Sequence, residues 1–144
     1  SEGTLISDEK ELSYPPVIVI EPDQTLLHIS TNDFSFVAEH HLSMIFSLLA
    51  KYRLKVNMMR NTAISFTVCV NNNPDRILKF EKELGAEFKM ITDNDLELVT
   101  IRHFNEDILK DMKKNKLILF EEKIPDTVQM VVRNLPKMKR KDIQ

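Results

Sequence analysis

The stretch KVNMMRNTAISFTVCV, residues 55–70, alternates apolar and polar side chains through its second half. Such alternation predicts a strand from Ile64 to Val70 with one apolar face, because successive side chains of a strand point to opposite sides. A shorter strand, Val56 to Met59, precedes it, and the polar residues Arg60 to Thr62 form the corner between the two. The stretch therefore predicts a hairpin, and its corner could either be scaffold or border a small ligand.

On both sides of this hairpin the apolar period changes to that of helices. Leu42, Ile45, Phe46 and Leu49 follow the spacing of an amphipathic helix, and Pro74 and Gly85 suit the first turn and the cap of another. The expected order is a strand at Thr25 to Ser30, a helix from Phe36 to about Arg53, strands Val56 to Met59 and Ile64 to Val70, a helix at Asp75 to Leu84, and a strand at Phe88 to Ile91. This βαββαβ order predicts an α+β, ferredoxin-like sandwich.

After a predicted turn at Asp93 to Asp95 the pattern begins again, but the second unit is incomplete. Its expected elements are a strand in LELVTIRHF, a helix from Glu106 to Asn115 capped by Asn105, and a hairpin of KLILFEEKI and DTVQMVVRN. A unit this short has difficulty burying a core alone. The unassigned strand Val17 to Ile20, set apart by Pro22-Asp23, would complete its sheet. We therefore expect the first module to be inserted in the second. The expected boundaries are a linker at 1–16, the first module at 25–92, the truncated second module at 17–23 plus 96–134, and a basic tail at 135–144.

Composition excludes several classes of protein. The chain of 144 residues is 42% apolar and 29% charged, with a net charge of −2, which is typical of a globular protein and favours neither nucleic acid nor membrane. Two glycines are too few for a phosphate-binding glycine loop. No secretion leader or membrane segment is predicted, and the lone Cys69 favours a cytoplasmic setting.

The residues give little support to an enzyme. Adjacent His40 and His41 would point about 100° apart on a helix, so we expect no metal site. Asp93 and Asp95 fit a solvated turn better than an acid–base pair. An acylphosphatase would need an arginine after the first strand, where this chain reads STNDFS, and an RNA-recognition module would need aromatic side chains on the open sheet face.

The loop from Thr31 to Phe36 should lie at the amino terminus of the first helix. Unpaired amides there attract carboxylates, and Asn57 on the neighbouring strand could receive an ammonium group. A free amino acid carries both charges and would suit this place. A polar loop without any ligand is the alternative.

The sequence also resembles a known family of proteins, the aspartate kinases, in their regulatory region. The resemblance is carried by Gln24-Thr25-Leu26, Phe46-Ser47-Leu48-Leu49-Ala50, Val56-Asn57-Met58-Met59 with Thr62, and Ile64-Ser65-Phe66, together with EGTLIS as the linker that leaves the kinase domain. It implies two ACT domains, the first inserted in the second, in a regulatory fragment without catalysis of its own. The protein's own kinase domain, with its ATP and magnesium, would be the partner of this region and is absent from the fragment. It also implies a homodimer formed through ACT domains and feedback control by lysine or threonine.

The resemblance further implies which residues bind the effector. These are Ser35, Phe36, Val37, Ala38, His41 and Leu42 in the loop and helix start, and Lys55, Val56, Asn57, Thr62 and Ala63 in the opposing strand. Lysine-binding members usually carry glycine, aspartate and glutamate where this chain has His40, Asn57 and Ala63. Lysine specificity is therefore open, a second effector site in the shorter module is not expected, and a dimerisation module with a non-functional pocket is the alternative function.

Overall fold

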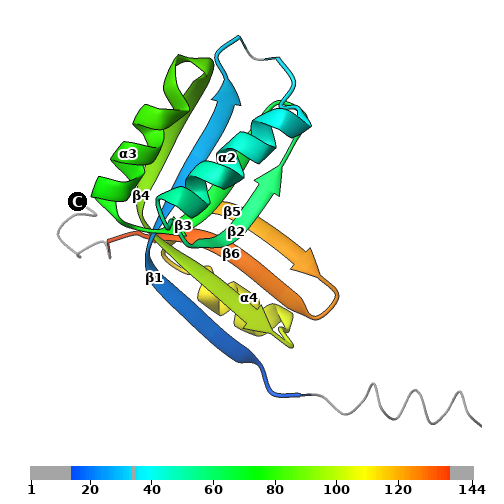
Figure 1. Ribbon diagram of the computed structural model, residues 1–144. Helices are drawn as coiled ribbons and strands as arrows, with labels where there is room; N and C mark the ends of the chain where they lie inside the picture. The colour runs from blue at the N-terminus through cyan, green and yellow to red at the C-terminus, as the bar shows by residue number, and fades with distance from the viewer. Residues whose placement is uncertain (1–13, 34, 137–144) are drawn as a thin grey trace, which may run out of the picture. The chain divides into compact units, whose positions relative to one another are not determined.

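The computed structural model describes residues 14–33 and 35–136. Its elements, labelled in Figure 1, are β1 (Val17–Thr31), α2 (Glu39–Lys51), β2 (Val56–Asn61), β3 (Phe66–Asn71), α3 (Pro74–Leu84), η1 (Gly85–Glu87), β4 (Phe88–Arg102), α4 (Glu106–Met112), β5 (Lys116–Ile124) and β6 (Thr127–Asn134). The described residues divide into two compact units. Glu21–Leu98 forms the inserted unit, and the residues up to Ile20 together with those from Val99 onward form the flanking unit.

The inserted unit is a four-stranded antiparallel layer with two helices. Its strands lie in the order β2-β3-β1-β4. The ladder of β1 with β3 runs from Gln24 opposite Asn71 to Ile29 opposite Phe66, and β2 pairs with the other side of β3. Helices α2 and α3 cover one face of this layer (Figure 1). The core between them is made by Leu27, Ile29, Ile45, Leu48, Leu49, Leu54, Phe66, Val68, Val70, Ile77, Phe80, Leu84 and Phe88.

Local sequence explains where α3 begins and ends. The Asn73 side chain accepts a hydrogen bond from the Arg76 amide at 3.1 Å, which satisfies one of the amides that the first turn leaves unpaired. Pro74 occupies the first turn, where its missing N–H costs nothing. Gly85, with φ of 70°, ends the helix in a conformation that other residues rarely adopt. These features confirm the predicted helix.

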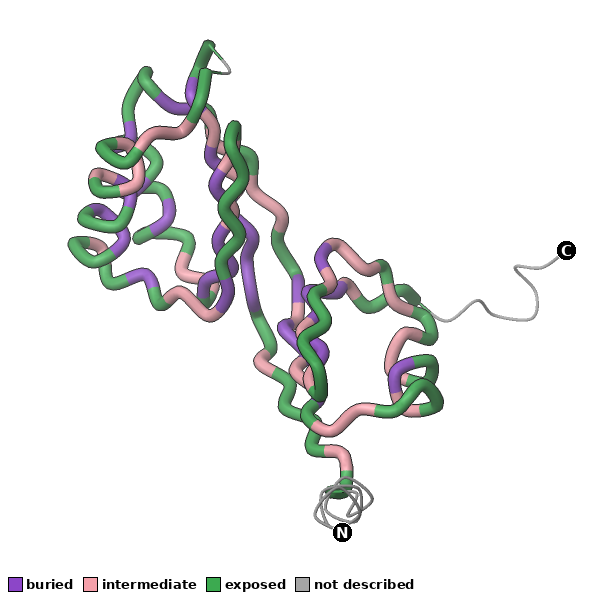
Figure 2. The backbone as a smooth tube through the Cα atoms, turned by 90° about the vertical axis from the view of Figure 1, so that its right-hand side faces the viewer, coloured by how far each residue is buried: buried purple, intermediate pink, exposed green. Residues whose placement is uncertain are grey.

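The flanking unit repeats the arrangement in shorter form. Its strands lie in the order β1-β4-β6-β5, and α4 begins at Asn105, whose side chain accepts a hydrogen bond from the Ile108 amide at 2.8 Å. The core of this unit consists of Val99, Ile101, Leu109, Val128, Met130 and Val132. Figure 2 colours the backbone by how far each residue is buried. The predicted α+β, ferredoxin-like fold, with its first module inserted in a truncated second, is confirmed.

Two predicted breaks are wrong. Pro22-Asp23 does not divide β1, which runs unbroken from Val17 to Thr31, and Asp93–Asp95 is not a turn but part of β4. Asp23 and Asp95 take the left-handed conformation, with φ of 53° and 60°. A single residue in this conformation lets a strand absorb an irregularity and continue, and aspartate tolerates it better than most residues.

Element ends also differ from the predictions. Helix α2 spans Glu39–Lys51 rather than Phe36 to Arg53, and α4 stops at Met112 rather than Asn115. Arg53 and Asn115 both have positive φ, of 51° and 55°, which ends helical geometry that spacing alone would extend. None of the described helices is long and apolar enough to cross a membrane. The predicted linker and tail lie outside the described residues, apart from 14–16 and 135–136.

Candidate functional site

The loop between β1 and α2 is held by hydrogen bonds from three directions. Within it, the Thr31 hydroxyl donates to the Ser35 carbonyl at 2.9 Å, and the Ser35 amide donates to the Asp33 carboxylate at 3.0 Å. The Asn32 amide donates to the Glu87 carbonyl at 3.0 Å, and the Val37 amide donates to the carbonyl of Ala63 at 2.9 Å. The loop is therefore tied both to η1 and to the corner between β2 and β3.

A cavity of about 280 Å³ opens beside this loop, within the inserted unit. Polar and charged side chains line it: Thr31, Asn32, Asp33, Ser35, His41 and Glu87. They come from the end of β1, the loop, the first turn of α2 and η1. We call this cavity the loop pocket.

His41 is the most enclosed ionisable side chain of the loop pocket, with 12% of its side chain exposed. The Ala38 amide donates to its Nδ1 at 3.0 Å, so the ring caps the first turn of α2 in place of a side chain at position 38. A neutral imidazole that accepts at Nδ1 carries its proton on Nε2. That nitrogen lies 3.4 Å from the Glu87 carboxylate. The Phe88 ring packs almost perpendicular to the imidazole, with ring centroids 5.4 Å apart.

The pocket carries negative charge. Hydrogen bonds from Ser35, first from its side chain and then from its backbone, hold the pKa of Asp33 below its usual value, so this carboxylate is ionised at neutral pH. Glu87 adds a second carboxylate to the lining. Among the described residues that line the cavity, none is lysine or arginine. A cationic group therefore suits this pocket better than an anionic one.

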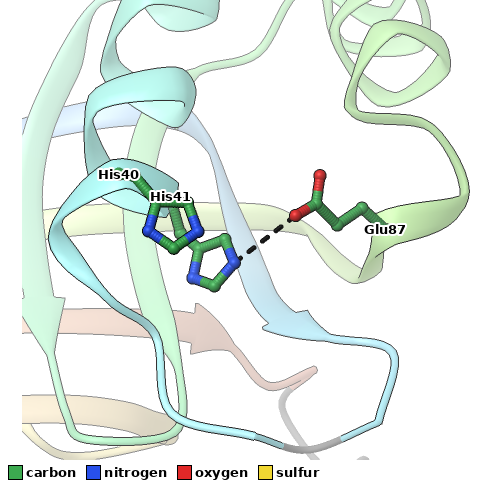
Figure 3. Close-up of side chains that lie close together, drawn as sticks. All are labelled: His40, His41 and Glu87. Atoms are coloured by element: carbon green, nitrogen blue, oxygen red, sulfur yellow. Dashed lines mark ion pairs between the residues drawn. The ribbon is translucent and has the colours of Figure 1, made fainter.

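His40, His41 and Glu87 form a cluster whose ligand atoms lie within 4.8 Å of one another (Figure 3). The prediction that the adjacent histidines point apart is wrong, because their ring centroids are 4.0 Å from each other. Metal binding by His41 would nevertheless need either the Nδ1 lone pair that the Ala38 amide occupies or the Nε2 position that holds the proton. Since the hydrogen bond that caps α2 competes with a metal ion, we assign no metal to this cluster.

The predicted effector residues fall into two separate places. Ser35 and His41 line the loop pocket, Val37 and Ala38 anchor its loop, and Ala63 is joined to that loop by its carbonyl. The structure thus brings the first group of predicted residues together with the corner at Thr62-Ala63. Phe36 is 74% exposed, and Leu42 packs against the helix-covered core instead of facing the pocket.

Lys55, Val56 and Asn57 lie at the other end of β2. Val56 is opposite Val70, whereas Asn61, next to the corner, is opposite Phe66. Five residues of strand correspond to about 16 Å. The Asn57 amide donates to Gln24 at 2.8 Å and to Asn71 at 2.7 Å, so it is engaged within the sheet. These three residues do not approach the loop pocket.

The corner itself is internally satisfied. The Thr62 hydroxyl lies 2.8 Å from the Ser65 hydroxyl, and the Thr62 amide donates to the Ser65 carbonyl at 2.9 Å. The side chains of Thr62 and Ser65 thus close the turn, and the Ala63 carbonyl accepts a hydrogen bond from the loop. The corner supports the loop of the pocket through the Ala63 carbonyl.

Sequence reasoning did not identify Glu87 as a site residue. It lies 46 positions after His41, outside any motif, and only the packing of η1 against the loop brings the two side chains together. Asp33 lies in the loop that the sequence singled out, but it was not among the residues that the family resemblance supplied. Its spacing to Ser35, typical of a turn in which a carboxylate accepts from an amide two residues on, could have drawn attention to it.

Comparisons with known proteins agree with this geometry at the level of fold. No model of a protein family and no curated protein sequence matches the chain. A domain assigned as the C-terminal regulatory domain of aspartate kinase from Porphyromonas gingivalis W83 matches with a TM-score of 0.67 and 11% identity, over 83% of this chain and 86% of that one. The regulatory subunit of aspartate kinase from Thermus thermophilus, in a ligand-free form, matches with a TM-score of 0.59 and 11% identity, over 84% of this chain and 89% of that one.

A longer protein also matches. Aspartokinase III from Escherichia coli, in complex with lysine and aspartate, gives a TM-score of 0.59 and 14% identity over 81% of this chain. The match spans 29% of that longer chain. The class of fold is therefore the ACT-domain pair. The arrangement of this pair is that of aspartate kinase regulatory regions. The resemblance seen in the sequence is therefore confirmed at the level of the fold.

Proposed function

We propose that this chain is an amino-acid-binding regulatory module of an aspartate kinase and that its effector occupies the loop pocket. The observation that carries the proposal is a small cavity beside the start of α2 with two carboxylates in its polar lining. Asp33 and Glu87 supply carboxylates for an ammonium group. The carboxylate of the amino acid would lie toward the start of α2, where the helix dipole favours negative charge. The amides of Ala38 and His41 at this end are already paired, with the His41 ring and with the Ala38 carbonyl.

The size of the pocket supports a single amino acid as the ligand. Its volume, about 280 Å³, lies just below the range of roughly 300–1,000 Å³ that small-molecule sites occupy, which leaves room for a small ligand only. A nucleotide would also need cations or amide-rich glycine loops for its phosphates, and the lining carries carboxylates instead. The pocket thus favours a zwitterion without bulky anionic groups.

Among amino acids, lysine fits the charge of the pocket better than threonine. The family resemblance made lysine doubtful because Asn57 and Ala63 stand where carboxylates are usual, but Asp33 and Glu87 supply two carboxylates from other elements. Lysine carries two ammonium groups, so each carboxylate could pair with one. Threonine offers a single ammonium group and would leave one carboxylate without a cationic partner.

The regulatory role requires two states of the whole protein. Feedback control of aspartate phosphorylation would follow if the effector binds more tightly to the arrangement in which the kinase domain is inactive. The proposal includes that kinase domain, with its ATP and magnesium, as the partner of this module, and a homodimer formed through ACT domains. The E. coli aspartokinase III complex with lysine and aspartate supports lysine as the first effector to test.

Isothermal titration of the full chain with lysine, threonine and methionine tests the proposal. We expect lysine to bind, and Glu87→Gln to weaken its affinity about tenfold or more, since the ammonium group loses its negatively charged partner and keeps only a neutral acceptor. The matched control is Glu122→Gln, which removes an equivalent charge from an exposed position on β5, remote in sequence from the pocket. Equal loss in both variants would point to net charge rather than to a site.

Absence of heat and of any shift in melting temperature with all three amino acids would contradict effector binding. Sedimentation with and without lysine then separates the remaining function from the proposed one. A stable dimer whose sedimentation does not change with any of the amino acids would support the alternative, a dimerisation module whose pocket no longer binds an effector.

A further inference from the structure

The first half of β1 is the edge of the flanking unit's sheet. The ladder between β1 and β3 extends from Gln24 to Ile29, so β3 does not reach Val17–Ile20. In the sheet order, β4 is the remaining neighbour of β1. Among the described strands, the first half of β1 therefore has a partner on one side and an open row of backbone groups on the other.

This edge is apolar and uncovered on both faces. Val17, Ile18, Val19 and Ile20 are exposed to between 41% and 48%, although alternate residues of a strand point to opposite faces. None of them belongs to the core of the flanking unit. In this unit, the described helix α4 packs through Leu109 against β4 and β6, and the described residues include no helix over Val17–Ile20. Four consecutive β-branched residues at an open edge are a surface prone to pairing.

Prolines set the length and direction of this edge. Pro22 lies within β1 and has no amide hydrogen, so its nitrogen must face away from β4 for the strand to stay paired there. Because backbone groups alternate in direction, Ile18 and Ile20 direct their N–H and C=O groups to the same open side. Pro16 precedes the strand by one residue. Pro16 and Pro22 thus stand three residues on either side of Val19 and end any pairing at both limits.

We propose that this edge, Val17–Ile20, pairs with the same edge of a second copy of the chain in an antiparallel, two-fold arrangement centred on Val19. In this register Ile18 lies opposite Ile20, Val19 faces Val19, and Pro16 lies opposite Pro22, so the pairing is self-complementary and limited in length. Ile18 and Ile20 of the two copies form about four inter-strand hydrogen bonds. The proposal rests on the dimerisation part of the proposed function and is independent of effector binding.

The second copy is favoured as the occupant by this symmetry. The apolar run lacks the charges with which natural edge strands discourage pairing, and the same sequence read in the opposite direction supplies matching β-branched residues. The edge is smaller than the roughly 800 Å² per partner of a standard interface. The dimer that it forms is therefore concentration-dependent, and contacts elsewhere in a full-length protein would strengthen it.

Cysteine crosslinking of the full chain tests the register. In the proposed pair the two Val19 positions are not hydrogen-bonded to each other, so their Cα atoms lie about 4.5 Å apart, within the range of about 4.4–6.8 Å that disulfides span. With oxidised glutathione as oxidant, Val19→Cys should give a covalent dimer. Ile20→Cys is the matched control, because the thiol introduced there would face Ile18 of the other copy and lie too far from its own equivalent. Buried Cys69 adds no background in the folded chain.

Sedimentation velocity over a concentration series provides the second measurement. Ile18→Lys should raise the dissociation constant of the dimer at least about tenfold without altering the far-UV circular dichroism, because Ile18 is already exposed. Ile124→Lys, at a 54% exposed apolar position on β5 of the same unit, should leave the constant unchanged.

The outcomes separate this proposal from the proposed function. A dimer that Val19→Cys does not crosslink and that Ile18→Lys does not weaken uses another surface, which would overturn the edge pairing but not dimerisation. A chain that stays monomeric at about 1 mM would overturn both. Lysine titration remains a separate test of effector binding in every case.

Discussion

Gln24 is 1% exposed and lies at the centre of a side-chain hydrogen-bond network on β1, β2 and β3. Its amide nitrogen donates to Asn71 at 2.9 Å, and its amide oxygen accepts from Asn57 at 2.8 Å and from the Cys69 thiol at 3.2 Å. A buried amide costs little when its groups are paired, and much more when one partner is removed. The network explains why Asn57 serves the sheet and not a ligand.

The thiol of Cys69 should be unreactive in the folded chain. Burial, and secondarily the charge of Glu21, raises the pKa of its thiol to about 12. At pH 8 the thiolate should be about 1,000-fold scarcer than for a thiol of pKa 9.0, so native Cys69 should resist iodoacetamide. Mass spectrometry of alkylated protein, with and without denaturant, checks this. Rapid modification of the folded chain, at the rate seen in urea, would show that the thiol is not enclosed.

The two helices of the inserted unit begin in different ways. Helix α3 has a side-chain cap from Asn73, whereas α2 begins at Ala38 without one and relies on His41, three residues further on. The cap of α2 is thus made by a residue of the loop pocket. An effector that contacts His41 would act directly on the start of this helix.

The side-chain cap of α3 should stabilise the fold measurably. Asn73→Ala should lower the free energy of unfolding by about 1 kcal/mol, because the Arg76 amide loses its acceptor. Asn73→Asp, which keeps an acceptor oxygen beside the helix amino terminus, should stay close to the wild type. Urea denaturation followed by circular dichroism measures both. If alanine and aspartate behave alike, the side-chain hydrogen bond does not stabilise the helix.

The two units of the molecule differ in whether they are formed by a continuous segment of the chain. The inserted unit, Glu21–Leu98, is continuous in sequence and has its own core around Phe80. The flanking unit needs β1 from one end of the chain and β4, β5 and β6 from the other. A continuous unit closes its contacts without the remaining chain, which favours independent folding.

The nested order predicts that residues 21–98 fold alone. A polypeptide of this range should melt cooperatively by circular dichroism, because its helix-covered core contains both strands and helices of the unit. Phe80→Ala should destabilise it by about 3–5 kcal/mol, since Phe80 is fully buried in that core. A broad, non-cooperative melt of the unsubstituted polypeptide would mean that the insert depends on the flanking unit.

The sequence predicted most where the cause was local. Asn73, Pro74 and Gly85 act within a few residues of themselves, and the predicted bounds of α3 differ from the observed ones by one residue. The breaks at Pro22-Asp23 and Asp93–Asp95 were wrong for the opposite reason. Local propensity favours a turn there, but pairing with a neighbouring strand holds each segment extended, and one left-handed aspartate per strand accommodates the irregularity.

The candidate site was predictable only in part. Ser35 and His41 were expected at the start of α2, because a loop before a helix exposes amides wherever it occurs. The place of Glu87 in the pocket lining follows from packing, and the distance of Asn57 from the loop follows from strand register. Local sequence specifies neither. The sequence by itself thus determined the order of elements and the α+β fold through period and capping. The tertiary structure alone decided which carboxylates meet His41 and which edge stays open, because both depend on contacts between residues far apart in the chain.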